Sequence, residues 1–209
     1  MDSKTSRHAP PRVAPLPSPP GPDIAAAFAK AVPPPFTVPG LYQTVARNEK
    51  VFLAFAEAPL LSRRGLMHTG QISDLERELV ILRITGRLGA AHEWGVHVAY
   101  FGKTGGMTAS QIEDTVRSPL TPALWTERQQ AIVRLIDDLV ERHDVSDESF
   151  AMARRTLSEA DVIEVVTLAG LYNMIAWNVR ALRVAEEPGA PPFPWPVWRP
   201  IASPADTAR

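Results

Sequence analysis

Apolar residues recur at helical intervals through most of the chain between about residues 40 and 186. In residues 41–58 they are spaced three and four positions apart until Pro59 interrupts the pattern. Residues 159–184 are apolar at almost every position, which is typical of a helix at the centre of a protein or in a subunit interface. No segment alternates between apolar and polar positions as a half-buried strand does, so the pattern predicts an all-α protein.

Capping signals mark where the predicted helices begin. Ser73 precedes Glu76 by three positions, which is the spacing of a capping box. The helix that starts there should continue to Leu88, because Gly89 suits a helix C-terminus. A second helix should follow over about residues 90–101. The same signature predicts the starts of three later helices, at Thr108 with Gln111, Thr126 with Gln129, and Ser158 with Asp161.

Prolines divide the chain into three regions, because most of the 21 lie near the two ends of the sequence. A proline inside a helix removes a backbone hydrogen bond and clashes with the preceding turn. We therefore expect a proline-rich N-terminal arm (1–39), a helical domain (40–186), and a tail rich in proline and tryptophan (187–209). Within the first arm, residues 23–32 have the composition of one short helix.

Composition and charge narrow the classes of function. The net charge of -1 generates no overall field that favours nucleic acid or a membrane surface. No window approaches the ~20 apolar residues of a membrane span. Residues 1–22 lack the apolar core of a signal peptide, so we expect a cytoplasmic protein. The absence of cysteine excludes disulfides, thiolate metal ligands and redox chemistry at a protein thiol.

Three polar side chains stand out in residues 78–97, "ELVILRITGRLGAAHEWGVH". At about 100° per residue, Glu78 lies at the centre of an apolar stripe, and Arg83 projects from the opposite, solvent-facing side. On the next helix, Glu93 and His97 are four residues apart and share one face. Because one glycine joins the two helices, Glu78 can approach the Glu–His pair inside an aromatic-lined space.

Both a functional and a purely structural interpretation fit these residues. A buried carboxylate must be hydrogen-bonded, paired with a charge or protonated, and Glu78 alone could pair with Arg83 or Arg180. A lone buried histidine such as His97 is usually a satisfied core residue. A Glu–His pair at this spacing is often a simple contact on a helix surface. The combination in adjacent helices leaves the two interpretations about equally supported by the pattern.

The order and spacing of several motifs between residues 41 and 184 resemble the carboxymuconolactone decarboxylase family, whose fold is shared with alkylhydroperoxidase D. The matching segments include "ERELVILRITGRLGAAHEWGVHV", "GGMTASQIE" and "WTERQQAIVRLIDDLVERHDVSD". The resemblance implies an alkylhydroperoxidase D-like helical bundle and a homo-oligomer, a trimer or a hexamer, built on the apolar helix 159–184. The aromatic tail "FPWPVW" would dock on a neighbouring subunit; the alternative is a solvated polyproline strand.

The alkylhydroperoxidase branch of the family relays protons to a C-x-x-C pair through a glutamate and two histidines. By position, Glu78 matches the glutamate and His97 the terminal histidine, while His92 matches the histidine between the cysteines. Ala90 and Glu93 occupy the two thiol positions. Neither side chain can form a sulfenate or a disulfide, so thiol peroxidase chemistry is excluded.

The E-W-x-x-H pattern at residues 93–97 resembles the decarboxylase branch instead, although His92 stands where many members have tyrosine. The resemblance implies a lyase that removes carbon dioxide from a small unsaturated carboxylate or lactone without a metal or organic cofactor. His97 would be the proton donor, because an imidazole titrates near neutral pH. Glu78 would orient His97 or hold a proton, and Glu93 would act as a second proton carrier or orienter. The same trio offers a metal ion one imidazole and two carboxylates, but the resemblance argues against a metal site.

Five further residues are predicted to contact the small-molecule substrate. Trp94 and Tyr100 share the face of His97, and Asn173 and Trp177 on the late apolar helix would close the pocket. Arg83 is the candidate cation for a substrate carboxylate, although it projects away from the predicted site. Two alternatives stay open, a non-catalytic oligomeric binding protein of the same fold and a hydrolase, isomerase or cyclase that acts on a related small molecule.

Overall fold

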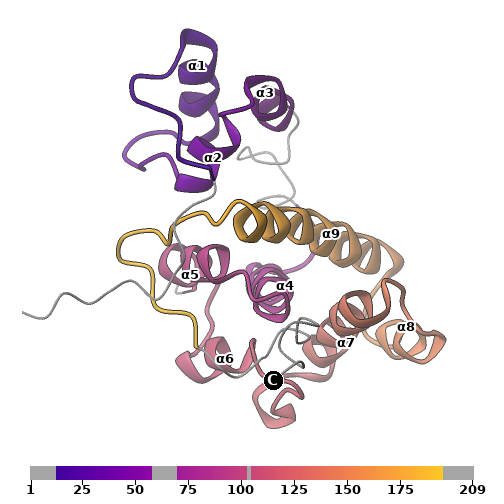
Figure 1. Ribbon diagram of the computed structural model, residues 1–209. Coiled ribbons are helices and arrows are strands. Elements are labelled where there is room, and N and C mark those ends of the chain that lie inside the picture. Colours follow the sequence, from indigo (N-terminus) through magenta and orange to yellow (C-terminus); the bar gives the residue numbers. More distant parts are fainter. Residues whose placement is uncertain (1–12, 58–69, 103–104, 195–209) are drawn as a thin grey trace, which may run out of the picture.

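The computed structural model describes residues 13–57, 70–102 and 105–194, and every regular element in these ranges is a helix (Figure 1). The all-α prediction is therefore confirmed for the described residues. The elements are α1 (Pro22–Ala31), α2 (Gly40–Val45), α3 (Glu49–Glu57), α4 (Asp74–Arg87), α5 (Ala91–Tyr100), α6 (Ala109–Asp114), the short 3-10 helix η1 (Pro122–Leu124), α7 (Glu127–Arg142), α8 (Asp147–Ala153) and α9 (Glu159–Ala181).

The predicted capping boxes form at the starts of their helices. At α4 the Ser73 hydroxyl accepts a hydrogen bond from the backbone N–H of Glu76, whose carboxylate accepts one from the N–H of Ser73. Gly89 follows the helix with a φ of 63°, a left-handed conformation that glycine adopts without steric cost. The same reciprocal pairs form at Thr108 with Gln111, Thr126 with Gln129, and Ser158 with Asp161.

Helix α4 lies at the centre of the main bundle, in contact with α5, α7 and α9 (Figure 1). Arg83 is fully buried, so the prediction of a solvent-facing side on this helix is wrong. Its guanidinium forms two hydrogen bonds with the Asp137 carboxylate of α7, at 2.8 and 2.6 Å, and a third with the Thr115 carbonyl at 3.0 Å. Because α7 covers this side of α4, the arginine is neutralised inside the protein rather than by water.

The first three helices form a separate layer on one side of α9 (top in Figure 1). The rings of Phe28 in α1 and Phe52 in α3 meet edge to face at 5.0 Å, at the centre of a second hydrophobic cluster. The described part of the proline-rich arm, residues 13–39, therefore packs with residues 40–57 rather than extending from them. The reason is that α1 carries apolar side chains that must be buried against a partner.

Helix α9 is the long apolar helix that the pattern predicts. By length and composition alone this helix could cross a membrane. The sequence analysis did not predict such a span. Of the most apolar 18-residue window in the helix, 56% is buried inside the protein. The core helix of a globular protein has the same apolar composition, so this is weak evidence of a membrane span. Part of the helix surface is exposed and apolar, with Ile163 and Trp177 66% and 62% exposed.

The chain after α9 runs back along α5 (Figure 1). The Ala185 carbonyl lies 2.6 Å from Nδ1 of His92, and the buried ring of Phe193 meets the Trp94 indole edge to face at 5.4 Å. The first residue of the aromatic tail thus packs on its own chain. Residues 195–198, the last four of the segment predicted to dock on a neighbouring subunit, lie outside the described residues.

Candidate functional site

Helices α4 and α5 bring together the three polar side chains that the helical periodicity singled out. Nδ1 of His97 lies 2.9 Å from Oε2 of Glu78, and Nε2 of His97 lies 3.6 Å from Oε1 of Glu93. All three residues are buried. The turn at Gly89 permits this contact, because its left-handed conformation reverses the chain between the two helices within a few residues. We call these three residues the Glu–His–Glu cluster.

The charge state of His97 follows from its two neighbours. Burial alone lowers the pKa of the imidazole, but the charge and hydrogen bond of Glu78, together with Glu93, outweigh burial and raise the pKa to about 9. The ring is therefore an imidazolium at neutral pH and carries an N–H on each nitrogen. The sequence analogy assumed an imidazole that titrates near neutrality, whereas the structure holds a proton donor that stays charged to a higher pH.

Two aromatic rings enclose the imidazole. Phe101 stacks on His97 with ring centres 5.0 Å apart, and Tyr172 of α9 meets His97 edge-on at 5.1 Å. Burial raises the pKa of the Tyr172 hydroxyl, and the negative charges of Glu93 and Glu78 raise it further. The phenol therefore stays protonated and can donate a hydrogen bond, but it does not compete with His97 as a base.

Tyr42 of α2 is electrostatically linked to the same cluster. Burial raises the pKa of its hydroxyl, and the Glu93 carboxylate adds to the increase. Glu93 thus acts on tyrosines from two other helices, Tyr42 and Tyr172. The sequence analysis missed both, because no local spacing relates α2 or α9 to a residue of α5.

Arg77 supplies a cation beside the cluster that the sequence analysis also missed. It precedes Glu78 in α4, and its positive charge opposes the increase in the pKa of Tyr172. The side chain is buried, with Nη1 2.6 Å from Asp74 and Nη2 3.1 Å from the Ile72 carbonyl. Its Nε–H is buried and has no hydrogen-bond partner among the residues that the structure describes. A buried donor without a partner is uncommon and leaves Arg77 able to bind a further acceptor.

Four of the five residues predicted to contact the substrate are either exposed to solvent or hydrogen-bonded to other parts of the protein. Arg83 is sequestered by the α7 carboxylate, so it cannot serve as the substrate cation. Trp94 donates from Nε1 to the Thr115 hydroxyl at 3.1 Å. Tyr100 ends α5 and is 54% exposed, and Trp177 projects from α9 into solvent. Arg83, Trp94 and Tyr100 thus share a helix with a cluster residue but not its environment.

Two further predictions concern His92 and Asn173. His92 is buried against the segment after α9, and within the described ranges its Nε2 atom has no hydrogen-bond partner. Asn173 is half-buried and follows Tyr172 in α9. Within the residues that the structure describes, no group of three or more His, Asp or Glu side chains is arranged to hold a metal ion.

Sequence comparison does not identify relatives of this chain, because no protein-family model matches it and no curated protein matches it significantly. Solved structures do share its fold. An uncharacterized peroxidase-related protein from Silicibacter sp. TM1040 matches with a TM-score of 0.72 and 17% identity, over 88% of this chain and 96% of that one. A second such protein, from Ralstonia eutropha JMP134 and described as an alkylhydroperoxidase AhpD core, has a TM-score of 0.66 and 16% identity, over 86% and 95% of the two chains.

The debrominase Bmp8 is a further structural match, with a TM-score of 0.64 and 14% identity over 84% of this chain and 92% of that one. Identities this low show a common fold and not a common activity. The arrangement of helices nevertheless agrees with the expectation from the sequence motifs. The chain therefore has the alkylhydroperoxidase D-like helical fold, the fold of the carboxymuconolactone decarboxylase family that its motifs resemble.

Proposed function

We propose that the protein is a cofactor-free enzyme that transfers protons at Glu78, Glu93 and His97, and that its reaction is the decarboxylation of a small unsaturated carboxylate or lactone. The observation that carries the proposal is the buried position of His97 between the carboxylates of Glu78 and Glu93, which raise the pKa of the imidazole to about 9. A buried, permanently poised proton donor is what the protonation step of such a reaction requires.

The two nitrogens of His97 differ in how firmly they are held. The Nδ1–H is held by Glu78 at 2.9 Å, within hydrogen-bond distance, whereas Nε2 is 3.6 Å from Glu93, beyond it. The looser nitrogen can exchange its partner for a substrate without breaking a good hydrogen bond. We therefore assign Nε2–H as the proton donor and Glu78 as the residue that orients and charges the ring. Glu93 is the carboxylate that takes up a proton from solvent after the reaction and passes it to Nε2.

The reaction needs one proton and one place for negative charge. When the C–C bond to the carboxylate breaks, carbon dioxide leaves and the bonding electrons delocalise into the lactone carbonyl. The Tyr172 hydroxyl, kept protonated by its raised pKa, is the donor proposed for that developing oxyanion. His97 then gives its Nε2 proton to the carbon, and the neutral imidazole keeps its Nδ1–H towards Glu78. Arg77 replaces Arg83 as the cation proposed for the substrate carboxylate, because no described residue accepts a hydrogen bond from its Nε–H.

Thiol peroxidase chemistry has no support in this chain. Peroxidase-related proteins and a debrominase share the fold, but the sequence contains no cysteine, and Ala90 and Glu93 stand at the positions that match the family's thiols. A common fold hosts several activities, so the side chains of the site decide between them. They favour acid–base chemistry over oxidation.

Two other interpretations use the same cluster. A hydrolase, isomerase or cyclase on a related small molecule would keep the roles of His97 and Glu78 and change the substrate. A non-catalytic binding protein would use the buried charges only to specify packing.

We also propose that the chain forms a homo-oligomer, a trimer or a hexamer, through the exposed apolar stripe of α9, which includes Ile163, Gly170 and Trp177. A stripe of this kind is uncommon on a helix that faces only water. A cytoplasmic location stays a prediction. The partner of the site is a small molecule, and no nucleic acid is expected.

The decisive experiment measures carbon dioxide release from carboxymuconolactone and related unsaturated carboxylates by the parent protein and by His97→Ala. We expect turnover by the parent and a loss of about 10²–10⁴-fold in the variant, the usual effect of removing a positioned acid. Tyr100→Phe, on the exposed end of the same helix, is the matched control and should keep the parental rate. A folded His97→Ala protein with the parental rate would show that the cluster is structural.

A further inference from the structure

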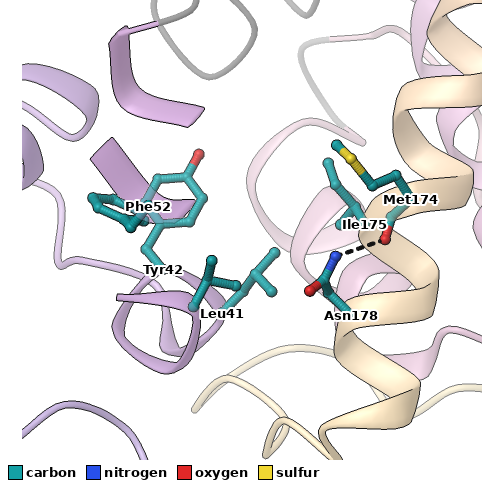
Figure 2. A pocket seen from close by; sticks show the side chains of 7 residues that line it. Leu41, Tyr42, Phe52, Met174, Ile175 and Asn178 are labelled. Atoms are coloured by element: carbon teal, nitrogen blue, oxygen red, sulfur yellow. Dashed lines mark hydrogen bonds between the residues drawn. The ribbon is translucent and has the colours of Figure 1, made fainter. Parts of the chain in front are cut away.

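The Glu–His–Glu cluster is tightly surrounded by other parts of the protein, and the small pocket in Figure 2 lies outside it. That pocket, between α2 and α9, has a volume of about 20 Å³, which admits a water molecule but not a ring. Its described lining comes from α2, α3 and α9 and includes none of the three cluster residues. Residues packed directly against the cluster therefore determine where its side chains lie.

Gly105, in the turn that follows α5, is one such residue. It is buried, and its backbone lies directly beside the side chain of Glu78. A methyl group at this position would lie 3.0 Å from Cγ and 3.3 Å from Cβ of Glu78, whereas carbon atoms that are not bonded normally stay about 3.5–4.0 Å apart. Any larger side chain would therefore displace the glutamate or the turn. The absence of a side chain at Gly105 leaves the space that Glu78 occupies.

Phe101, which follows the last residue of α5, is a second residue packed on the cluster. Its ring stacks on the His97 imidazole with ring centres 5.0 Å apart and planes inclined by 29°. The backbone N–H of Phe101 donates to the His97 carbonyl at 2.8 Å, and the Phe101 carbonyl accepts a hydrogen bond from the Gly105 N–H at 2.7 Å. A backbone hydrogen bond thus joins the residue that contacts the imidazole to the residue that contacts Glu78.

Both residues act on the same hydrogen bond, one from each side. Nδ1 of His97 lies 2.9 Å from Oε2 of Glu78, and a hydrogen bond weakens as its distance and angle depart from the preferred values. Gly105 contacts the acid, and Phe101 contacts the ring. A shift of a few tenths of an ångström in Glu78, the displacement that a methyl group on Gly105 would require, is enough to weaken this bond.

We propose that Phe101 and Gly105 are positioning residues that together set the geometry of the contact between Glu78 and His97. We call these two residues the α5 clamp. Neither carries a titratable group, so neither transfers a proton itself. The inference rests on the proposed function for its effect on turnover, but its effect on the His97 ring requires no substrate.

The pKa of His97 in Gly105→Ala tests the acid side of the α5 clamp. We expect this pKa to fall by about 0.5–1 unit, a part of the effect that an opposite charge supplies, because the carboxylate moves away from Nδ1. An NMR titration of the ring in the full-length protein measures it. Gly86→Ala, about two turns along α4 from Glu78, is the matched control. Its methyl group would lie 3.0 Å from Cγ1 of Val116, so it is equally crowded but should leave the His97 titration unchanged. A folded Gly105→Ala protein with the parental titration contradicts the inference.

Unfolding in urea shows whether Glu78 is the group that crowds the added methyl. Gly105→Ala should lower the urea midpoint of the parent but lower it much less in Glu78→Ala, because that variant vacates the space of Cγ. Gly86→Ala should have the same effect in both backgrounds. If Gly105→Ala causes an equal loss in both, or prevents folding in both, the glycine serves the fold alone and the inference is wrong.

Solvent exchange of the Nδ1–H of His97 tests the ring side of the α5 clamp. Phe101→Leu removes the stacked ring, so exchange followed by NMR should be at least about 10-fold faster than in the parent. Phe101→Tyr keeps the stacked ring and should exchange at the parental rate. Phe150→Leu, at an exposed residue of α8, is the control. Parental exchange in Phe101→Leu contradicts the inference.

Turnover separates this inference from the proposed function. Gly105→Ala and Phe101→Leu should lower kcat by about 10-fold and leave KM within about 2-fold of the parent, because both residues position the proton donor. If the parent decarboxylates nothing while both variants alter the His97 ring as described, the proposed function fails and the α5 clamp stands. If the parent turns over and both variants keep the parental pKa, exchange rate and kcat, the α5 clamp fails and the function stands.

Discussion

The carboxylate of Glu78 meets the imidazole of His97 at 2.9 Å, across the junction of two helices and out of contact with solvent. This contact does two things to the ring. It orients the ring by accepting a hydrogen bond from Nδ1–H, and it supplies the largest of the effects that raise the pKa of His97 above 6.5. The orientation and the charge of the proposed proton donor therefore depend on one residue of α4.

Replacing Glu78 should lower the pKa of His97. In Glu78→Gln the side-chain shape is kept but the negative charge is lost, so the pKa should fall by about 1–3 units, the range typical for an opposite charge at this distance. An NMR titration of the His97 ring measures it. Glu141→Gln, which removes a half-exposed carboxylate from an ion pair with Arg87, is the control and should leave the His97 titration unchanged. A Glu78→Gln protein with an unaltered His97 pKa would contradict the assigned cause.

Stability should fall as the pH rises above neutrality. The pKa of His97 is about 9 in the folded protein and 6.5 ordinarily, so the folded state binds the proton more tightly than the unfolded chain. Its contribution, on the order of 3 kcal/mol, is complete below pH 6.5 and is lost as the pH rises through 9. Urea unfolding at a series of pH values measures this loss. In His97→Gln the free energy of unfolding should change much less over the same range, and an equal slope in both proteins would refute the prediction.

Arg83 should matter for stability and not for catalysis. Arg83→Met leaves the Asp137 carboxylate without its main partner, and removing one member of a buried pair typically destabilises a protein by about 3 kcal/mol. The rate per folded molecule should stay at the parental value, because Arg83 faces α7 rather than the Glu–His–Glu cluster. Arg142→Met is the control: its exposed guanidinium lies 3.6 Å from the buried Asp138, which keeps its hydrogen bonds from Ser146, so stability should change by less than about 1 kcal/mol. Denaturation and rate measurements on the same samples separate the two effects.

The proposed oligomer should depend on the exposed stripe of α9. Trp177→Glu places a charge on that stripe, and burying an unpaired charge in an apolar interface is strongly unfavourable, so the assembly should dissociate. Light scattering after size-exclusion chromatography gives the mass. Phe150→Glu, at an exposed apolar residue of α8, is the matched control and should leave the mass unchanged. A monomeric parent, or an oligomeric Trp177→Glu protein, would rule out this interface.

Local features of the fold could be predicted because their interactions close within a few residues. The capping boxes at Ser73 and Thr108 join a side chain to a backbone group three residues on, and the structure contains both. The approach of His97 to Glu78 was also predictable, because a single glycine turn separates two short helices whose faces follow from a period of about 3.6 residues.

Features that depend on what covers a helix could not be predicted in this way. Periodicity predicted that Arg83 faces solvent, but α7 covers that side of α4 and supplies the Asp137 carboxylate that pairs with the guanidinium. For the same reason, the electrostatic effects that link Tyr42, Tyr172 and Arg77 to the cluster could not be predicted. The helices that carry them, α2, α9 and α4, become neighbours only after the chain has folded. Periodicity also wrongly predicted that Tyr100 would be buried in the site. This residue shares the face of His97 but lies at the exposed end of α5.

The sequence by itself thus determined the helical class, the starts of the four helices with capping boxes (α4, α6, α7 and α9) and the proximity of Glu78, Glu93 and His97, because hydrogen bonds and side-chain spacing along one helix are set by neighbours in the chain. The tertiary structure alone decided the charge of His97, through burial and two carboxylates acting together. It also decided which cation and which phenols accompany the cluster. Burial and electrostatic interactions depend on distance in space, and residues from α2, α4, α5 and α9 become neighbours only when the helices pack.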